Sequence, residues 1–153
     1  MADWTLFLAS GLGFSAKTTY GLLALMELAD LESSGERLQV GEIAVRQAIP
    51  ERYLEQMMTS LRRAGILRST RGARGGYQLA RPAGQIQLAE VIACLDGEAD
   101  RTDPSGGSAE LQVISALAED LRQQRFARLA ATSLADLLQQ RDARRQAQAM
   151  YFI

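Results

Sequence analysis

The chain has 153 residues, of which 47% are hydrophobic and 23% charged, and its formal net charge is −1. This length suits one domain, or a small domain with an appendage, and the apolar content is enough for a buried core. A single cysteine and no histidine exclude disulfide frameworks, zinc sites built from cysteine and histidine, and enzyme mechanisms that need a histidine base. No catalytic residue or metal site is therefore assigned, and a reducing, cytoplasmic location without membrane association is expected.

Residues 1–13 form an apolar N-terminal extension that lacks the basic start of a secretory signal and is too short to cross a bilayer. We expect this extension to pack on the body of the protein or on a second subunit, and a start codon assigned too early is the alternative. After it, Ser15 caps a predicted helix from about Ala16 to Glu32. Apolar residues cover most of its circumference, which is typical of a helix that is buried or shared between subunits.

The next two predicted helices lie close together in the chain. The shorter one runs from Val40 to Ala48 and follows Gln39, where a stronger cap such as serine would be expected. Pro50 then occupies the first turn of the other helix, where its missing N–H does no harm, and Gly65 suits the left-handed residue that ends a helix. Apolar residues at helical spacing predict one buried face on this helix, made of Tyr53, Leu54, Met57, Leu61 and Ala64.

Two short strand candidates follow at residues 66–70 and 77–80, joined by a glycine-rich loop at residues 71–76 and stopped by Pro82. Two short helices, a connecting turn, a third helix and a hairpin make the winged helix-turn-helix pattern. The predicted fold class is therefore mainly α with a small β hairpin, in which residues 14–96 form a winged helix-turn-helix DNA-binding domain.

The third helix and the hairpin carry a block of charge of one sign. No acidic residue occurs between Glu55 and Glu90, whereas arginines recur through this stretch, at Arg62, Arg63, Arg68, Arg71, Arg74 and Arg81. A basic surface of this kind is expected to face phosphates. The helix also carries a polar stripe at i, i+3, i+4 and i+7 that can contact base edges in a major groove, made of Arg52, Glu55, Gln56 and Thr59. An ordinary solvated helix face is the alternative interpretation.

The loop between the strands has the features of a wing that contacts DNA. Its glycines let the backbone approach a phosphate or enter a minor groove, and Arg71 and Arg74 supply positive charge. A nucleotide-phosphate loop is one alternative, although this loop has no lysine and leads into a strand. A purely structural hairpin is another. The predicted DNA-binding residues are Arg52, Glu55, Gln56, Thr59, Arg62, Arg63, Arg71, Gly72, Arg74, Gly75 and Gly76.

The C-terminal half begins with a predicted helix at residues 88–95, followed by a loop at residues 97–109. A long helix is predicted at residues 110–131, and Ser133 with Asp136 comes close to a capping box that starts a last helix.

The long helix carries an apolar stripe that has no evident partner inside a compact winged domain, so residues 110–153 are expected to form a dimerisation helix followed by a C-terminal helix and tail. The residues of the predicted dimer interface are Leu111, Ile114, Leu117, Ala118 and Leu121. The tail at residues 146–153 ends in an apolar segment that is expected to be docked or disordered.

Two smaller features have structural interpretations. Cys94 lies beside the apolar stripe of its helix, and acidic neighbours argue against a lowered pKa, so a buried small hydrophobe is favoured over a redox-sensing thiol. Glu98, Asp100 and Asp103 alternate like metal ligands, but the glycine and glutamate of an EF-hand loop are missing. This loop is therefore expected to be solvated.

Three stretches of the chain resemble the Rrf2 family of bacterial winged-helix transcription regulators, which includes IscR, NsrR and CymR. They are SAKTTYGLLALMELA at residues 15–29, VGEIAVRQAIPERYLEQMMTSLRRAGILRSTRGARGGYQLARP at residues 40–82 and IQLAEVIACLDG at residues 86–97. The combination of YLEQ, LRRAGIL and RGxxGGYQLARP is specific to that family. The resemblance implies a homodimer with the long helix as its two-fold contact. It also implies DNA binding by the third helix and the wing, with Arg52, Glu55 and Gln56 at the base-contacting positions.

The chain departs from the family in the residues before Gly13, since relatives generally start close to Phe14, and also in the loop before the long helix and in the wing. Relatives that bind an iron–sulfur cluster carry three cysteines in the loop before the long helix, and this chain has no cysteine after Cys94. Because a cluster needs about four ligands, no iron–sulfur cluster or other cofactor is predicted. The wing also differs, since residues 72–77 are GARGGY where the family usually has GPGGGY.

The function predicted from the sequence is a homodimeric, sequence-specific transcriptional regulator, most often a repressor, that binds double-stranded DNA at a pseudo-palindromic operator. Its signal is expected to come from an unidentified protein or small-molecule effector. The alternative is a protein-interaction module in which the winged scaffold and the long helix bind a partner enzyme. An enzyme is not expected, because the chain shows no histidine, no cysteine–base pair and no paired buried carboxylates.

Overall fold

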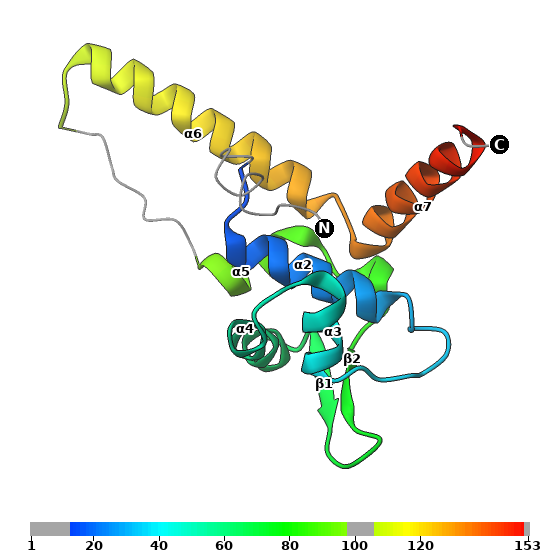
Figure 1. Ribbon diagram of the computed structural model, residues 1–153. Coiled ribbons are helices and arrows are strands. Elements are labelled where there is room, and N and C mark those ends of the chain that lie inside the picture. The colour runs from blue at the N-terminus through cyan, green and yellow to red at the C-terminus, as the bar shows by residue number, and fades with distance from the viewer. Residues whose placement is uncertain (1–12, 98–105, 152–153) are drawn as a thin grey trace.

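A computed structural model of the chain describes residues 13–97 and 106–151 (Figure 1). Residues 1–12 of the N-terminal extension, the loop with Glu98, Asp100 and Asp103, and the last two residues lie outside the described residues, so the expectations for them stay predictions. The described elements are α2 (Ala16–Ala29), α3 (Val40–Gln47), α4 (Glu51–Arg63), β1 (Leu67–Thr70), β2 (Gly76–Leu79), the short 3-10 helix η1 (Ala83–Gln85), α5 (Leu88–Asp96), α6 (Ala109–Ala130) and α7 (Leu134–Tyr151). The predicted fold class, mainly helical with a small hairpin, is confirmed.

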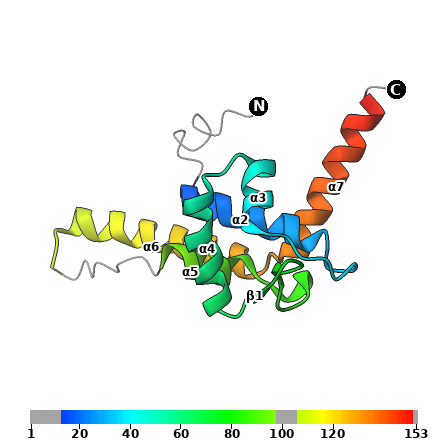
Figure 2. The same ribbon diagram turned by 60° about the horizontal axis from the view of Figure 1, so that its bottom comes forward.

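The body of the protein forms around α2, which packs against α3, α4, α5, α7 and β2. Figure 1 shows the hairpin projecting from one side of this body, while α6 and α7 leave on the other side in different directions. Figure 2 brings the hairpin side forward and shows α4 along its length with the hairpin beside it. In the part of the chain that the structure describes, no helix combines the length and apolar content needed to span a bilayer.

Helix α2 begins at the predicted cap and ends earlier than predicted. The Ser15 hydroxyl accepts a hydrogen bond from the backbone N–H of Thr18 at 3.1 Å, which satisfies one of the free donors of the first turn. The helix ends at Ala29 instead of Glu32, and both carboxylate oxygens of Glu32 accept from the backbone N–H of Ala83, at 3.2 and 3.3 Å. Glu32 therefore links the turn after α2 to η1.

The turn between α3 and α4 has a left-handed residue that is not glycine. Ala48 has φ 54° and ψ 44°, and the next N–H, of Ile49, donates to the carbonyl of Ala44 at 2.9 Å. Pro50 directly precedes the first residue of α4 instead of lying inside its first turn, and its carbonyl accepts from Leu54. The absence of a side-chain cap at Gln39 is confirmed.

The end of α4 follows the prediction. Gly65 has φ +78°, its N–H donates to Arg62 O, and the N–H of Ile66 donates to Leu61 O, both at 3.0 Å. These two bonds form the Schellman motif, with buried Leu61 and Ile66 in its hydrophobic contact positions. One predicted core position is wrong: Ala64 is exposed, because it lies beyond the last full turn of α4.

Strands β1 and β2 pair antiparallel, with Leu67 opposite Leu79 and Thr70 opposite Gly76. Both leucines are buried, so the base of the hairpin belongs to the core. A bridge that the sequence did not predict extends this sheet: Leu38 and Tyr77 exchange two backbone hydrogen bonds, of 3.1 and 2.8 Å. This bridge joins the segment before α3 to the hairpin.

Helices α6 and α7 differ in how they contact the body. No residue of α6 is buried, whereas Leu134 at the start of α7 is fully buried and Arg141 forms a bidentate ion pair with Asp30, with both distances 2.7 Å. Ser133 and Asp136 form the predicted capping box at the start of α7. The expectation for the tail is wrong where the structure describes it, because residues 146–151 continue α7 as exposed helix.

Candidate nucleic-acid interface

Helix α4 separates a buried face from an exposed polar face. Its buried side chains are Leu54, Met57, Met58 and Leu61. On the other side, Arg52, Glu55 and Gln56 are all exposed, and we call these three residues the recognition face. Thr59 is half-buried, and its hydroxyl donates to the carbonyl of Glu55 at 2.9 Å, so its hydrogen is already used within the helix. The predicted stripe therefore faces solvent at its first three residues, whereas the Thr59 side chain is less exposed and already hydrogen-bonded.

Arg62 and Arg63 lie in the last turn of α4, where positive charge is favourable next to the negative end of the helix dipole. Both side chains are exposed, and neither forms an ion pair with any residue that the structure describes. The same holds for Arg71 and Arg74 on the hairpin loop, which we call the wing (residues 71–76). These four guanidinium groups remain available for an external anion.

The structure explains the three glycines of the wing in different ways. Gly72 has φ +109°, and a Cβ added there would meet no atom within 4 Å, so its backbone faces open space. At Gly75 a Cβ would lie 2.2 Å from the carbonyl oxygen of Thr70, and at Gly76 it would lie 2.7 Å from that of Leu38. Close packing within the hairpin at Gly75, and against the Leu38 segment at Gly76, therefore requires glycine at these two positions, and only Gly72 has the open surroundings that were expected of the wing.

The two remaining arginines between Glu55 and Glu90 differ in their contacts. Arg81 donates to Glu90 at 2.7 Å and to the carbonyl of Gln85 at 3.1 Å, so it is used in holding the segment after the hairpin. Arg68 is exposed on β1 and pairs with no acidic residue in the described chain. Arg68 was left out of the predicted DNA-binding residues. Its place among the other arginines of the sequence was the signal that could have included it.

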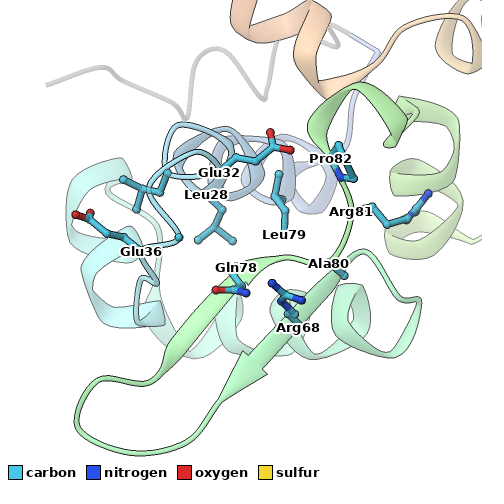
Figure 3. Close-up of a pocket in the computed structure, with 11 residues that line it drawn as sticks. Leu28, Glu32, Glu36, Arg68, Gln78, Leu79, Ala80, Arg81 and Pro82 are labelled. Atoms are coloured by element: carbon cyan, nitrogen blue, oxygen red, sulfur yellow. The ribbon is translucent and has the colours of Figure 1, made fainter.

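A pocket of about 210 Å³ lies at the base of the hairpin, next to the turn that follows α2 (Figure 3). Its apolar lining includes Leu28 and Leu79, and Glu32 and Arg68 are among its polar lining residues. Figure 3 shows the Arg81 side chain directed away from this pocket, in agreement with its bond to Glu90. The pocket adjoins the wing without including any residue of the recognition face.

Cys94 packs against the hydrophobic core and contacts the backbone of α4. Its thiol is half-buried and donates to the carbonyl of Ser60 at 3.4 Å. Burial raises the pKa of the Cys94 thiol, so the thiolate is disfavoured. Two residues further along the chain, Asp96 accepts hydrogen bonds from the hydroxyls of Ser15 and Thr18, both at 2.7 Å. This carboxylate therefore links the end of α5 to the start of α2, a role that the sequence did not indicate.

The predicted dimer residues form an exposed face of α6. Six large apolar side chains on this helix are between 48% and 71% exposed, and they are Leu111, Val113, Ile114, Leu117, Leu121 and Phe126. Ala118 is exposed in the same stripe. At the end of the stripe, the Arg125 guanidinium lies 5.0 Å from the ring centroid of Phe14, a cation–π contact. Isolated exposed apolar residues are common on protein surfaces, but a continuous stripe of this length indicates a binding surface.

Comparisons with known proteins agree with this architecture. A family model described as "Rrf2: Iron-dependent Transcriptional regulator" matches residues 14–140. The chain is 38% identical to the HTH-type transcriptional regulator IscR of Cereibacter sphaeroides over 96 residues, which cover 62% of each protein. It is 36% identical to the ORF2 protein of Azotobacter vinelandii over 132 residues, which cover 84% of this chain and 80% of that protein.

The solved structure of T. potens IscR superposes with a TM-score of 0.70 and 34% sequence identity, and the match covers 86% of this chain and 90% of that one. The chain spans about half the length of several other curated relatives that it matches, between 51% and 55%. The family model covers most of the chain, including all described elements from α2 to α6. The chain therefore belongs to the Rrf2 family of transcriptional regulators.

Proposed function

We propose that this chain is a sequence-specific DNA-binding repressor that acts as a homodimer on a pseudo-palindromic operator. The observation that carries the proposal is the pairing of an exposed recognition face on α4 with arginines of the wing that have no ion-pair partner among the described residues. Helices of this kind insert into the major groove and contact base edges, while flanking basic residues hold the phosphates. Family membership supports DNA as the partner.

Each part of the interface has a separate role in this proposal. Arg52 and Gln56 suit guanine and adenine respectively, and Glu55 can accept a hydrogen bond from cytosine. The phosphate backbone is contacted by exposed guanidinium groups that carry no base information, namely Arg62, Arg63, Arg71 and Arg74. Gly72 lets the wing backbone come close to the duplex.

The homodimer proposal rests on α6. Its exposed apolar stripe cannot be covered by the helix's own chain as the structure describes it, and a second copy offers an identical stripe for an isologous contact. Two recognition faces related by a two-fold axis then match an operator with two-fold symmetry. We propose that an unidentified protein or small-molecule effector supplies the signal.

The iron in the family description does not fit the residues of this chain. Within residues 13–97 and 106–151, no group of three or more histidine, cysteine, aspartate or glutamate side chains is placed to hold a metal ion. Cys94 is the one cysteine of the sequence, and its thiol is turned toward the Ser60 carbonyl inside the body. Because an iron–sulfur cluster needs about four ligands, we propose that this regulator works without one.

Binding of selected and random DNA by wild-type protein and two variants tests the proposed function, measured by fluorescence anisotropy at several salt concentrations. Arg74→Ala is expected to weaken binding to every sequence and to lower the salt slope by about one. Gln56→Ala is expected to relax the preference at one base pair, at a cost of about 1–3 kcal/mol. Arg144→Ala, an exposed arginine on α7, is the matched control and should change neither quantity.

Two results would contradict the proposal. An equal loss of affinity for selected and random DNA in Gln56→Ala would remove α4 from base recognition. A dimeric protein that binds no DNA at moderate salt would favour the protein-interaction module, in which the exposed stripe of α6 serves a different partner.

A further inference from the structure

Helix α6 contacts α5 and, through Arg125, the ring of Phe14, and it is also held by a short segment at its C-terminal end. Figure 1 shows α6 and α7 diverging from this point, which we call the interhelix joint (residues 131–133). Since α6 has no buried residue, packing of its own side chains in a core does not fix its orientation. The contacts of the joint therefore add a second constraint to the contacts that α6 makes with α5 and, through Arg125, with Phe14.

The interhelix joint is bound to the segment that precedes α5. Leu88 N–H donates to Thr132 O, and Leu134 N–H donates to Ile86 O, both at 2.9 Å. Gln87 lies opposite Ser133 in the antiparallel bridge that these bonds form. The two bonds run in opposite directions across the bridge, so the joint resists both sliding and rotation against the body.

Gln87 adds side-chain bonds on both sides of this bridge. In the amide orientation that its surroundings require, its nitrogen donates to Thr132 O at 3.2 Å and to Ala130 O, in the last turn of α6, at 3.3 Å. Its side chain also takes part in the capping box of α5, in which Glu90 accepts from the Gln87 N–H at 3.2 Å. One half-buried glutamine therefore joins the end of α6 to the start of α5.

Ser133 fixes the other side of the joint. It is only 7% exposed, its N–H donates to Asp136 at 2.8 Å, and its hydroxyl accepts from the Asp136 N–H at 3.1 Å. This reciprocal capping defines where α7 starts. Buried Leu134 and the ion pair between Arg141 and Asp30 then hold α7 on α2. The joint is thus tied to the domain that carries the recognition face through two independent elements.

We infer that Gln87 and Ser133 are positioning residues that set the angle between α6 and the DNA-binding domain, and through it the distance between the two recognition faces of a dimer. This inference rests on the proposed homodimer. The consequence is a preference for one spacing between operator half-sites, since half-site spacing follows the geometry of the dimer. The affinity of one recognition face for its own half-site does not depend on these two residues.

The matched comparison uses both ends of α6. Gln87→Ala with Ser133→Ala removes an amide contact and a helix cap at the joint. Gln112→Ala with Ser108→Ala removes the same two kinds of bond at the other end of α6, where Gln112 donates to Gly107 O and Ser108 caps Leu111 N–H. Both double variants therefore lose similar local interactions, and only the first one loosens the joint.

A measurement without DNA tests the geometry. A spin label is placed at Val45→Cys, an 83% exposed position on α3, in a chain with Cys94→Ser, and the distance between the two labels of the dimer is recorded by double electron–electron resonance. The joint variant is expected to broaden the distance distribution about twofold, because the loss of one helix cap changes a local folding equilibrium roughly fivefold. The control variant is expected to keep the wild-type width, and Ser133→Thr, which can still cap α7, should also keep it.

Binding to operators of stepped half-site spacing gives the second readout. Wild-type protein is expected to bind the operator of best spacing more tightly than an operator lengthened by one base pair. The ratio of these two affinities is expected to fall about fivefold in the joint variant and to stay unchanged in the control. A dimer whose distance width is the same in all variants overturns the inference, as does equal broadening in both double variants. If the distances behave as expected while no variant binds DNA, the inference stands and the proposed function fails.

Discussion

Gly75 and Gly76 show at the residue scale how an internal constraint can resemble a functional one. Their position in an arginine-containing loop suggested that they expose backbone to DNA, but only Gly72 has the open surroundings that such exposure needs. At the other two positions, the space that a side chain would need is taken by the carbonyls of Thr70 and Leu38. Composition cannot distinguish these cases, because the carbonyl of Leu38 comes from a segment far away in the chain.

Substitution at Gly75 tests this packing argument. Gly75→Ala places a Cβ 2.2 Å from the Thr70 carbonyl oxygen, so the turn must shift, and we expect a loss of about 1–3 kcal/mol in the free energy of unfolding together with weaker DNA binding. Gly84→Ala is the control, since its added Cβ makes only an ordinary contact of 4.0 Å with Ala135. Urea denaturation measures both, and equal stability of the two variants would contradict the packing argument.

The raised pKa of Cys94 predicts low thiol reactivity. A raised pKa leaves less thiolate at pH 8 than in the unfolded chain, and the thiolate is the reactive form. Alkylation by iodoacetamide is therefore expected to be slower in the folded protein than in urea, and to accelerate as the pH rises toward and above 9. Folded and unfolded chains that react at the same rate at pH 8 would show that the thiol is not protected.

At the element scale, the helices were predictable because their signals are local. Apolar periodicity placed the ends of α3, α5 and α6 within one residue of where the structure has them, and Gly65 marked the end of α4. The bridge between Leu38 and Tyr77 was not predictable, because a single pair of backbone bonds leaves no periodic pattern in the sequence. The roles of Glu32 and Asp96 were missed for the same reason, since both act on distant elements.

The helix-turn-helix connection contains strain that can be removed. Ala48 is the one non-glycine residue with positive φ in the described chain, and a left-handed conformation costs an alanine about 1–2 kcal/mol. Ala48→Gly is expected to stabilise the protein by about 0.5–1 kcal/mol after the entropic cost of glycine in the unfolded chain. A higher urea midpoint with an unchanged m-value is the expected result.

Gly65→Ala is the opposite substitution and serves as the control for that change. Gly65 has a similar positive φ at the end of α4 and no neighbouring atom within 4 Å of an added Cβ, so the substitution adds strain without a clash. A loss of stability there together with a gain at Ala48 would assign both effects to backbone conformation. A lower midpoint for Ala48→Gly would instead show that the turn is not strained.

At the scale of the whole molecule, the candidate interface and the dimer face lie on different elements and can be separated by mutation. Leu117 is 60% exposed on the apolar stripe of α6, so a charge there should not disturb the fold of one chain. Leu117→Glu is expected to convert the dimer to monomers, because two carboxylates would be buried at the two-fold contact. Analytical ultracentrifugation gives the oligomeric state, and circular dichroism checks the fold.

The matched control lies on another side of the same helix. Ala116→Glu introduces the same charge at an exposed position outside the apolar stripe, and it should leave the dimer intact. A Leu117→Glu protein that remains dimeric would exclude the stripe as the main subunit contact. The sequence predicted this face because its periodicity is local, but it could not predict that the whole of α6 lacks a buried residue, which depends on where the helix lies relative to the body.

The lack of buried side chains in α6 has a consequence for gene dosage. In the proposed homodimer, α6 would gain stabilisation from a second copy, so its folded population would rise with protein concentration. In the proposed homodimer, the number of assembled DNA-binding units in a dilute cell would grow with the square of the number of chains. Small changes in synthesis would then produce larger changes in promoter occupancy, and the regulator's own expression level would become part of its response.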